Sequence, residues 1–130
     1  MIVDSSALVS IILREPGFED YWNKILDAET LPKISAANYL ETAIVVDASK
    51  DPRNSRNLDK LLDEAEIEIV AMTAHQAHIA RAAYRDFGKG SGHKAQLNFG
   101  DCFAYALASD TGEPLLFKGN DFSETDIAAA

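Results

Sequence analysis

The chain has 130 residues and carries 12 Lys and Arg against 21 Asp and Glu, a formal charge of −9 that excludes a global electrostatic attraction for nucleic acid. Its length predicts a single domain, residues 1–130, and its one cysteine, Cys102, excludes an internal disulfide framework. No apolar run reaches the length of a membrane helix and no basic region precedes the apolar start, so we expect a cytoplasmic protein.

The first half of the chain predicts a strand over 2–4, helices over 7–14 and 18–28, a strand over 31–34, and helices over 35–49 and from 51 onward. The second half predicts a strand over 66–71, a helix over 74–87, a helix from 98 or 100 to 110, and a last strand over 115–117. Ser5 or Ser6 is expected to cap the first helix, and the glycine-rich residues 88–92 are expected to form a loop. Strands that alternate with helices are typical of an α/β domain with a parallel sheet. The tail, residues 126–130, is expected to be frayed.

Apolar periodicity predicts which faces of two helices are buried. In the helix over 18–28 the apolar face comprises Tyr21, Trp22, Ile25 and Leu26. This face serves either the core or a partner. In the helix over 35–49 the apolar stripe comprises Ala37, Leu40, Ile44 and Ala48. Glu41 lies beside that stripe, where a glutamate is usually exposed to solvent.

Four acidic residues lie at positions that can build a ligand site: Asp4, Glu41, Asp101 and Asp121. Asp4 ends the first strand, and Asp121 follows the last strand after a short turn. The carboxyl ends of parallel strands form the ligand crevice of an α/β sheet. Carboxylates crowded there repel one another unless a cation neutralises them, and oxygen ligands without a His/Cys cluster suit Mg²⁺ or Mn²⁺. Such metals can polarise a phosphodiester and activate water.

Each of these acids also has an ordinary structural explanation. Asp4 can cap a helix, and Glu41 can simply face solvent. Asp101 lies in the first turn of a helix, where the helix dipole favours an acid, and Asp121 can cap a short helix over 122–126. The set is more specific than any member because the four fall at equivalent points of the topology. Gly100, just before Asp101, also permits a close backbone approach.

Basic residues gather in two places despite the acidic balance. One group borders the Asp101 region and contains Arg81, Arg85, Lys89, His93 and Lys94. It is either a nucleic-acid contact or a solvated helix face. The other group contains Lys50, Arg53, Arg56 and Lys60 and is more typical of a solvated face. The histidines show no metal-ligand spacing with the acids.

Several segments, in order over nearly the whole chain, resemble the PIN-domain family, and within it the VapC-type toxins of bacterial toxin–antitoxin pairs. They are Met1-Ile2-Val3-Asp4-Ser5-Ser6-Ala7, Ile34-Ser35-Ala36-Ala37-Asn38-Tyr39-Leu40-Glu41, Phe87-Gly88-Lys89-Gly90-Ser91-Gly92-His93, Asn98-Phe99-Gly100-Asp101-Cys102 and Leu116-Phe117-Lys118-Gly119-Asn120-Asp121-Phe122. The resemblance implies a three-layer α/β/α fold with a short, mostly parallel central sheet. It also implies an endoribonuclease that depends on Mg²⁺ or Mn²⁺.

The resemblance assigns roles to individual residues. The catalytic quartet of the family maps onto Asp4, Glu41, Asp101 and Asp121, of which Asp4, Asp101 and Asp121 are the expected metal ligands. Ser6 matches the family's small hydroxyl residue in a supporting role. Many relatives carry Thr where this chain has Ser5 and Asp where it has Asn120. Asn120 leaves fewer negative charges for a second metal, so the number of bound metals, one or two, stays open.

The resemblance further implies partners. These are an RNA substrate such as tRNA or ribosomal RNA, a VapB-like antitoxin whose tail occupies the active-site groove, and a second toxin chain in a homodimer that can grow into a heterotetramer or larger assembly. The residues expected to contact RNA or antitoxin are Arg81, Arg85, Lys89, Lys94 and Lys118.

Two other functions fit parts of the pattern. A phosphoacceptor receiver module also gathers acids and magnesium at strand ends, and Lys118 could supply its lysine. Such a module needs paired acids after the first strand and an Asp at the end of a middle strand, and neither is present here. A PIN-like domain that only binds RNA or a partner is the other alternative.

Overall fold

The computed structural model describes residues 1–130, and its four strands form one parallel sheet in the order β3-β2-β1-β4. The strands are β1 (Ile2–Val3), β2 (Lys33–Ser35), β3 (Glu68–Val70) and β4 (Leu115–Leu116). Ile2 pairs with Lys33 on one side and with Leu115 on the other. Because all four strands run in one direction, their carboxyl ends lie along one edge of the sheet, as the alternation of strands and helices predicts.

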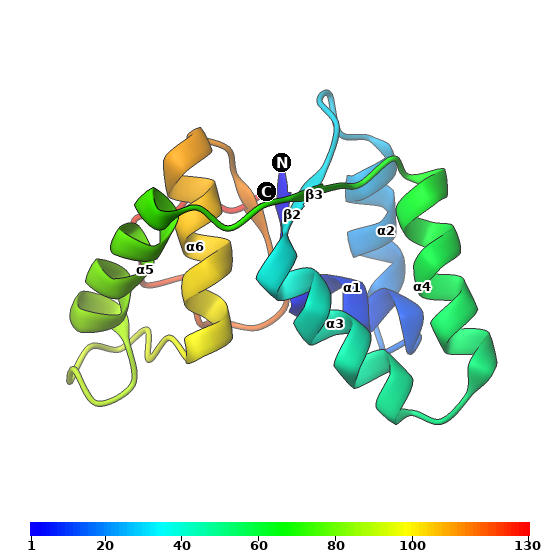
Figure 1. The fold of residues 1–130 in the computed structure, drawn as a ribbon, viewed down its shortest axis with the longest axis horizontal. Helices are drawn as coiled ribbons and strands as arrows, with labels where there is room; N and C mark the ends of the chain where they lie inside the picture. Colours follow the sequence, from blue (N-terminus) through cyan, green and yellow to red (C-terminus); the bar gives the residue numbers. More distant parts are fainter.

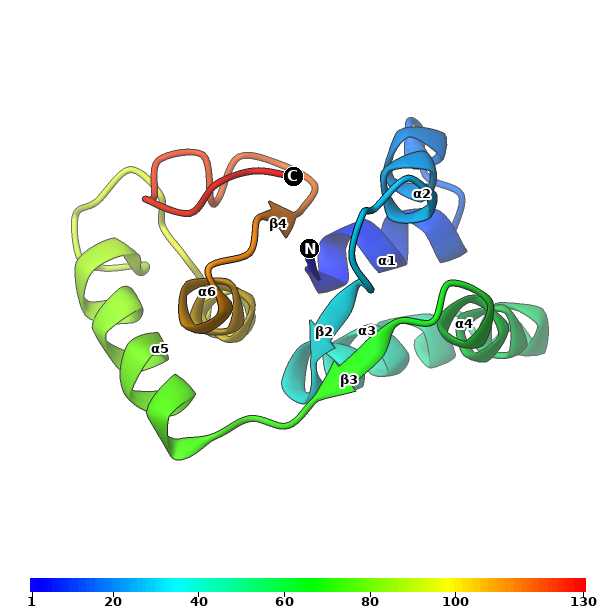
Figure 2. The same cartoon turned by 90° about the horizontal axis from the view of Figure 1, so that it is seen from above.

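Six helices cover the two faces of this sheet. They are α1 (Ser5–Ile12), α2 (Phe18–Leu26), α3 (Ala36–Ala48), α4 (Pro52–Glu64), α5 (Ala74–Phe87) and α6 (Phe99–Thr111). The pair α5 and α6 lies on one side, and α1 to α4 lie on the other (Figures 1 and 2). The three-layer α/β/α prediction is therefore confirmed. Crossing a membrane would take a longer and more apolar helix than any in this chain.

The two strands β1 and β4 are so short that each contributes one side chain to each face. Ile2 and Leu115 are buried with residues of α5 and α6, whereas Val3 and Leu116 are buried with residues of α1 to α4. This split follows from the two-residue period of a strand, which sends successive side chains to opposite faces. The sheet therefore acts as a thin layer between two separate apolar cores.

Three predicted boundaries or caps are wrong in detail. The cap of α1 is Asp4, whose carboxylate accepts from the Ser6 N–H, so neither Ser5 nor Ser6 caps this helix. The helix ends at Ile12 instead of residue 14, because Arg14 adopts a positive φ of 51° that no helix continues. The second strand starts at Lys33, and Leu31 lies before it with its side chain 55% exposed.

The predicted inner stripe of α3 is wrong. Leu40 and Ile44 are 58% and 60% exposed, and the buried face of α3 consists of Asn38, Thr42 and Val46. The two polar members of this face have internal partners, since the Thr42 hydroxyl donates to the carbonyl of Asn38 at 2.8 Å and the Asn38 amide donates across to α6. Polar groups with such partners can be buried. The prediction assumed that only apolar residues face the core, so it chose the wrong face of α3.

The apolar face expected for α2 is correct only in part. Ile25 is buried, and Tyr21 and Trp22 pack partly buried against the same core. Leu26 is exposed. Tyr21 and Trp22 therefore serve the core, as one of the two expectations held.

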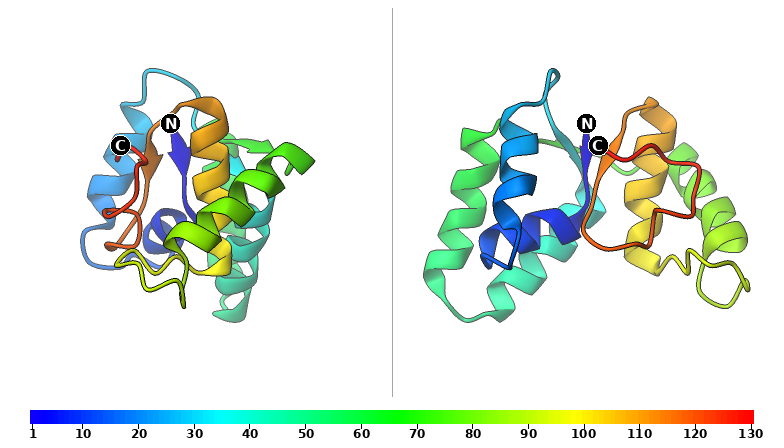
Figure 3. Two further views of the ribbon diagram at one scale, coloured as in Figure 1. Left: turned by 90° about the vertical axis from the view of Figure 1, so that its left-hand side faces the viewer. Right: turned by 180° about the vertical axis from the view of Figure 1, so that it is seen from behind.

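The C-terminal tail is not frayed. The Ala130 N–H donates to the carbonyl of Leu115 and the Leu115 N–H donates to the carbonyl of Ala128, both at 2.9 Å, so the tail pairs with the outer side of β4. The Tyr105 hydroxyl also donates to Asp126 at 2.7 Å. Figure 3 shows this segment crossing α6 and returning toward β4. The pairing satisfies the open backbone groups of an edge strand, a role that composition does not reveal.

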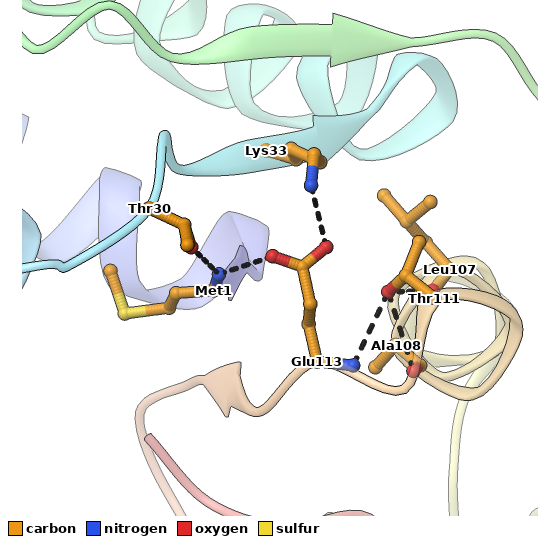
Figure 4. Close-up of polar contacts among 7 residues, drawn as sticks. All are labelled: Met1, Thr30, Lys33, Leu107, Ala108, Thr111 and Glu113. Carbon is orange, nitrogen blue, oxygen red and sulfur yellow. Dashed lines mark hydrogen bonds and ion pairs between the residues drawn. The ribbon is translucent and has the colours of Figure 1, made fainter.

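An ionic cluster joins three segments at the amino ends of the strands (Figure 4). The carboxylate of Glu113 accepts from the α-amine of Met1 and from Lys33 Nζ, each at 2.7 Å. Partial burial alone would raise the pKa of Glu113, but these hydrogen bonds and charges outweigh burial and lower it. The cluster ties β1, β2 and the approach to β4 together at the end of the sheet opposite the four acids.

Candidate active site

The strand ends bring the four predicted acids into one electrostatic cluster. Asp4 follows β1, Glu41 lies in the helix after β2, and Asp121 follows β4, while Asp101 lies in the first turn of α6. Helices α3 and α6 contact each other, which closes the group (Figure 1). The charge of Glu41 acts on Asp4, and the charges of Asp4 and Asp121 act on Asp101. The carboxylates are therefore near neighbours and are not scattered over separate faces.

Asp4 is the most buried of these acids, at 3% exposure. Its Oδ2 accepts from the Ser6 N–H at 3.0 Å and from the Ser6 hydroxyl at 2.5 Å. Its Oδ1 is buried and has no hydrogen-bond partner. Burial raises the pKa of Asp4 to about 6, with a further contribution from the charge of Glu41, although the bonds from Ser6 act in the opposite direction. This oxygen is therefore available to a ligand.

Ser6 connects Asp4 to the segment after the last strand. The Ser6 hydroxyl, which donates to Asp4, also accepts from the Lys118 N–H at 2.9 Å. A single hydroxyl therefore fixes both the carboxylate and the turn that leads to Asp121. The predicted supporting position of Ser6 beside the acids is where the structure places it.

Glu41 lies against the first turn of α6 and does not point freely into solvent. Its Oε1 accepts from the Ser5 hydroxyl and, at 3.4 Å, from Asn38 Nδ2. Its Oε2 occupies the space that a Cβ at position 100 would fill, so only glycine fits there without moving the carboxylate. The close approach expected at Gly100 is thus made by Glu41.

Asp101 has a structural role as well as its place among the acids. Its Oδ2 accepts from the Asn98 N–H at 2.9 Å, and its own N–H donates to Asn98 Oδ1 at 2.8 Å, a reciprocal capping box. Burial raises the pKa of Asp101, and the charges of Asp4 and Asp121 raise it further against the effect of the Asn98 N–H. A carboxyl at a helix start would normally have a lowered pKa, so burial, together with the neighbouring acids, outweighs the effect of the helix start here.

Asp121 is exposed and does not begin a helix. Residues 121–124 form turns, in which the Ser123 N–H donates to the carbonyl of Asn120 at 3.1 Å, so the expected helix over 122–126 is absent. The capping explanation for Asp121 therefore fails. The charge of Asp121 instead acts on Asp101 and helps to raise the pKa of that carboxyl. The side chain of Asn120 is exposed and makes no hydrogen bond within the chain.

Several known proteins are similar to this chain in sequence. The chain matches the PIN domain family over residues 1–128. The chain belongs to the PIN-domain family. It is 52% identical over 130 residues to ribonuclease VapC28 of Mycobacterium tuberculosis and to VapC ribonuclease Mb0625 of Mycobacterium bovis, covering 100% of this chain and 97% of each relative. It is 48% identical over 128 residues to ribonuclease VapC30 of Mycobacterium tuberculosis, covering 98% of this chain and 96% of that one. This PIN domain is accordingly a ribonuclease toxin of the VapC type.

Solved structures support the fold of this PIN domain. VapC20 of Mycobacterium tuberculosis, described as a toxin that cleaves the sarcin–ricin loop, superimposes with a TM-score of 0.76 over 99% of this chain and 97% of that one at 13% identity. A toxin–antitoxin complex from Klebsiella pneumoniae superimposes with a TM-score of 0.74 over 99% and 95% of the chains at 14% identity.

Two polar residues of this PIN domain contact the acids and were missed by sequence reasoning. Ser5 donates to Glu41, and Asn38, which is fully buried, donates to the carbonyl of Gly100 at 2.9 Å. Asn38 thereby links the helix that carries Glu41 to the helix that carries Asp101. The available signal was the spacing of Asn38, Thr42 and Val46, a second stripe of helical period that the apolar stripe obscured.

The basic residues predicted to contact RNA or antitoxin lie around the PIN domain without forming ion pairs to the four acids. Lys118 Nζ is 3.1 Å from Glu15, and Arg85 Nε is 3.1 Å from Asp86. The remaining three, Arg81, Lys89 and Lys94, are exposed on α5 and the loop that follows it. Within that loop the ring of His93 packs edge-on against Phe87 with centroids 4.9 Å apart.

The residues of this PIN domain fit a hard divalent cation in kind, although they are not arranged as a finished site. No group of three or more acidic, histidine or cysteine side chains is spaced to hold a metal as it stands. The donors are all oxygens, one of them is the buried and unpartnered Asp4 Oδ1, and Cys102 is buried away as a packing residue. Oxygen donors of this kind suit Mg²⁺ or Mn²⁺.

Proposed function

We propose that this PIN domain hydrolyses phosphodiester bonds in RNA and requires Mg²⁺, or Mn²⁺ in its place, at a site formed by Asp4, Asp101 and Asp121. The observation that carries the proposal concerns Asp4 Oδ1. This carboxylate oxygen is buried among other acids and has no hydrogen-bond partner. Both Asp4 and Asp101 have raised pKa values because burial and like charge disfavour their ionised forms. A divalent cation is the group that relieves this penalty.

The side chains have distinct roles in this proposal. A bound divalent cation supplies activation of water and neutralisation of the phosphate. Ser6 holds Asp4 in one orientation through Oδ2 and leaves Oδ1 for the cation. Glu41, fixed by Ser5, and the exposed Asp121 contact the cation directly or through water, or orient the attacking water. Asn120 adds no charge beside Asp121, which favours one strong cation site over two.

The proposed substrate is a structured RNA such as tRNA or ribosomal RNA. VapC20, which has the same fold, is described as cleaving the sarcin–ricin loop. The exposed Arg81, Lys89 and Lys94 supply local positive charge in a protein whose formal charge is −9. Arg85 and Lys118 contribute less because Asp86 and Glu15 partly neutralise them.

The proposed protein partners are a VapB-like antitoxin that blocks the acids and a second copy of the toxin. The structure from Klebsiella pneumoniae that shares this fold is a toxin–antitoxin complex. The exposed Leu40, Ile44 and Val45 on α3 form an apolar surface on the helix that carries Glu41, and burial of such a surface in a homodimer would be favourable. A heterotetramer or larger assembly would follow from two toxins binding their antitoxins.

The deciding experiment is cleavage of total RNA by the purified protein with Mg²⁺, with EDTA, and with Mg²⁺ restored in excess. We expect cleavage only when Mg²⁺ is available, and none from Asp4→Asn. Glu113→Gln serves as the control, since it also removes one negative charge, partly buried, but at the opposite end of the sheet. Undiminished cleavage in EDTA would contradict the metal-dependent mechanism. Binding of RNA without cleavage under any metal would identify a domain that only binds.

The receiver alternative has no support in the fold. The middle strand β3 ends at Val70 and continues into Ala71, so no Asp is available there as a phosphoacceptor. The sequence of this chain also matches the PIN domain family over residues 1–128.

A further inference from the structure

Phe99 has the most exposed side chain among the large apolar residues, at 77%. It is the first residue of α6, directly between the capping residue Asn98 and Gly100. Gly100 is the residue against which the Glu41 carboxylate rests, and Asp101 follows it. An aromatic ring is therefore displayed to solvent two residues before Asp101 and next to the glycine that the Glu41 carboxylate contacts.

The ring of Phe99 is held in place although it is exposed. Phe103, one turn further along α6, meets it edge-on with centroids 4.8 Å apart and planes at 84°. The backbone at Phe99 is fixed on both sides by the reciprocal hydrogen bonds between Asn98 and Asp101. A ring that is already ordered loses little conformational freedom when a flat partner covers it.

The core does not explain this residue. Phe99 belongs to neither apolar core, so its exposed ring is available to a ligand. The ring lies beside acids that are proposed to act on a phosphodiester, so the group nearest to it in a bound substrate is a nucleotide next to the cleaved bond. Every nucleobase has a flat face that can stack on an aromatic ring.

We propose that Phe99 is a stacking platform for an unpaired nucleobase adjacent to the cleaved phosphodiester, so that the substrate class is RNA with single-stranded nucleotides at the cleavage point. This inference rests on the proposed ribonuclease function. Stacking does not depend on charge, and this suits a protein whose formal charge of −9 gives phosphates little overall attraction. A continuous duplex hides the faces of its bases and would leave the ring uncovered.

The test measures stacking and binding separately from hydrolysis. The probe is a short single-stranded RNA with one 2-aminopurine, whose fluorescence falls when the base stacks, together with the same RNA in a blunt duplex. All proteins carry Asp4→Asn so that the probe stays intact. The substitutions are Phe99→Ala, Phe99→Leu and Phe99→Trp. Leu31→Ala is the control, because Leu31 is 55% exposed and lies before β2, at the other end of the sheet.

We expect Phe99→Ala to weaken binding of the single strand by about tenfold and to abolish the fluorescence change. Phe99→Trp should retain both, and Phe99→Leu should resemble Phe99→Ala, because leucine keeps the apolar area but has no ring face. Leu31→Ala should behave like the parent protein. The duplex should bind weakly to all of them.

Several results would overturn the inference. One is unchanged binding and fluorescence in Phe99→Ala, and another is full function in Phe99→Leu, which would make the contact merely apolar. A third is a change in the solution mass of Phe99→Ala with unaltered RNA binding, which would assign the ring to an interface between copies of the chain. Failure of the wild type to cleave RNA with Mg²⁺ would instead overturn the proposed function, and it would leave the stacking measurement valid.

Discussion

The hydroxyl of Ser6 donates to one oxygen of Asp4 at 2.5 Å, while the other oxygen of Asp4 is buried and accepts no hydrogen bond. This asymmetry separates an oxygen with a structural task from an oxygen available to a ligand. It also places an ionisable group in surroundings that disfavour its charge, because burial raises its pKa to about 6. The stability of the protein and its proposed chemistry are therefore linked through Asp4.

Asp4→Asn should remove cleavage and preserve the fold. Loss of a direct ligand should lower the cleavage rate by more than roughly a hundredfold. Substitution of residues that only hydrogen-bond to a metal ligand already lowers affinity or activity by about 10–100-fold. The melting temperature without metal should stay the same or rise, since one of a group of repelling charges is gone. Calorimetry and an RNA cleavage assay measure the two effects. A variant that cleaves as fast as wild type would eliminate Asp4 as a ligand.

The stabilisation by Mg²⁺ should grow with pH. A carboxyl whose pKa is raised on folding contributes stability that is fully present below its ordinary value of 3.8 and is lost as pH rises through about 6. For Asp4 the loss corresponds to at most about 3 kcal/mol, at roughly 1.4 kcal/mol per pKa unit. Mg²⁺ binds the ionised form, so its thermal shift should be larger near pH ~7.5 than near pH ~5. Equal shifts at both pH values, or the same pH dependence in Asp4→Asn, would contradict this.

Gly100→Ala should separate activity from stability. The added Cβ would overlap the Glu41 carboxylate, which is the end of a flexible side chain and can move away, so the fold should survive. The displaced Glu41 should lower cleavage by at least about tenfold. Gly112→Ala is the reciprocal control, because nothing lies within 4 Å of its Cβ but its φ is +70°. That variant should lose about 1–2 kcal/mol of stability and keep its activity. The reverse pattern would remove the close approach as an explanation.

Glu113→Gln should destabilise the protein without affecting cleavage. The carboxylate bridges the Met1 amine and Lys33, and hydrogen bonds to charged groups contribute about 1.5–3 kcal/mol. Because the pKa of Glu113 is lowered on folding, this stabilisation is present above its ordinary value of 4.5 and is lost as pH falls through the folded pKa. Urea unfolding at neutral pH should show the deficit, and unfolding in acid should show a smaller one. A deficit that persists in acid would point to packing instead of charge.

The sequence allowed the architecture to be predicted because its strongest signals are local. The alternation of strands and helices places most elements correctly. It could not identify the inner face of α3, because Asn38 and Thr42 look like surface residues until their partners across the fold are known. The pairing of Ala130 with Leu115 was equally invisible, since backbone hydrogen bonds carry no side-chain signature.

The positions of the acids were predictable from topology, whereas their support was not. The rule that parallel strands end at one edge was sufficient to group Asp4 with Asp121. Glu41 was included among the four acids, although its place beside an apolar stripe favoured exposure to solvent. The contact of Ser5 with Glu41 joins residues 36 positions apart in the chain, and no spacing rule connects them. The resemblance assigned the supporting hydroxyl to Ser6 alone, and the structure adds a second one.

The carboxylate of Asp101 caps the N-terminus of α6, and the same carboxylate is proposed to serve the reaction. A substitution at this position therefore confounds two losses, since an inactive variant could lack either a ligand or a properly started helix. Asn98 makes the two separable, because its side chain maintains the other half of the cap and takes no part in the acid cluster. Inactivated protein for structural or inhibitor work is consequently better made as Asp4→Asn, because Asp4 caps α1 and asparagine keeps a side-chain oxygen that can cap that helix.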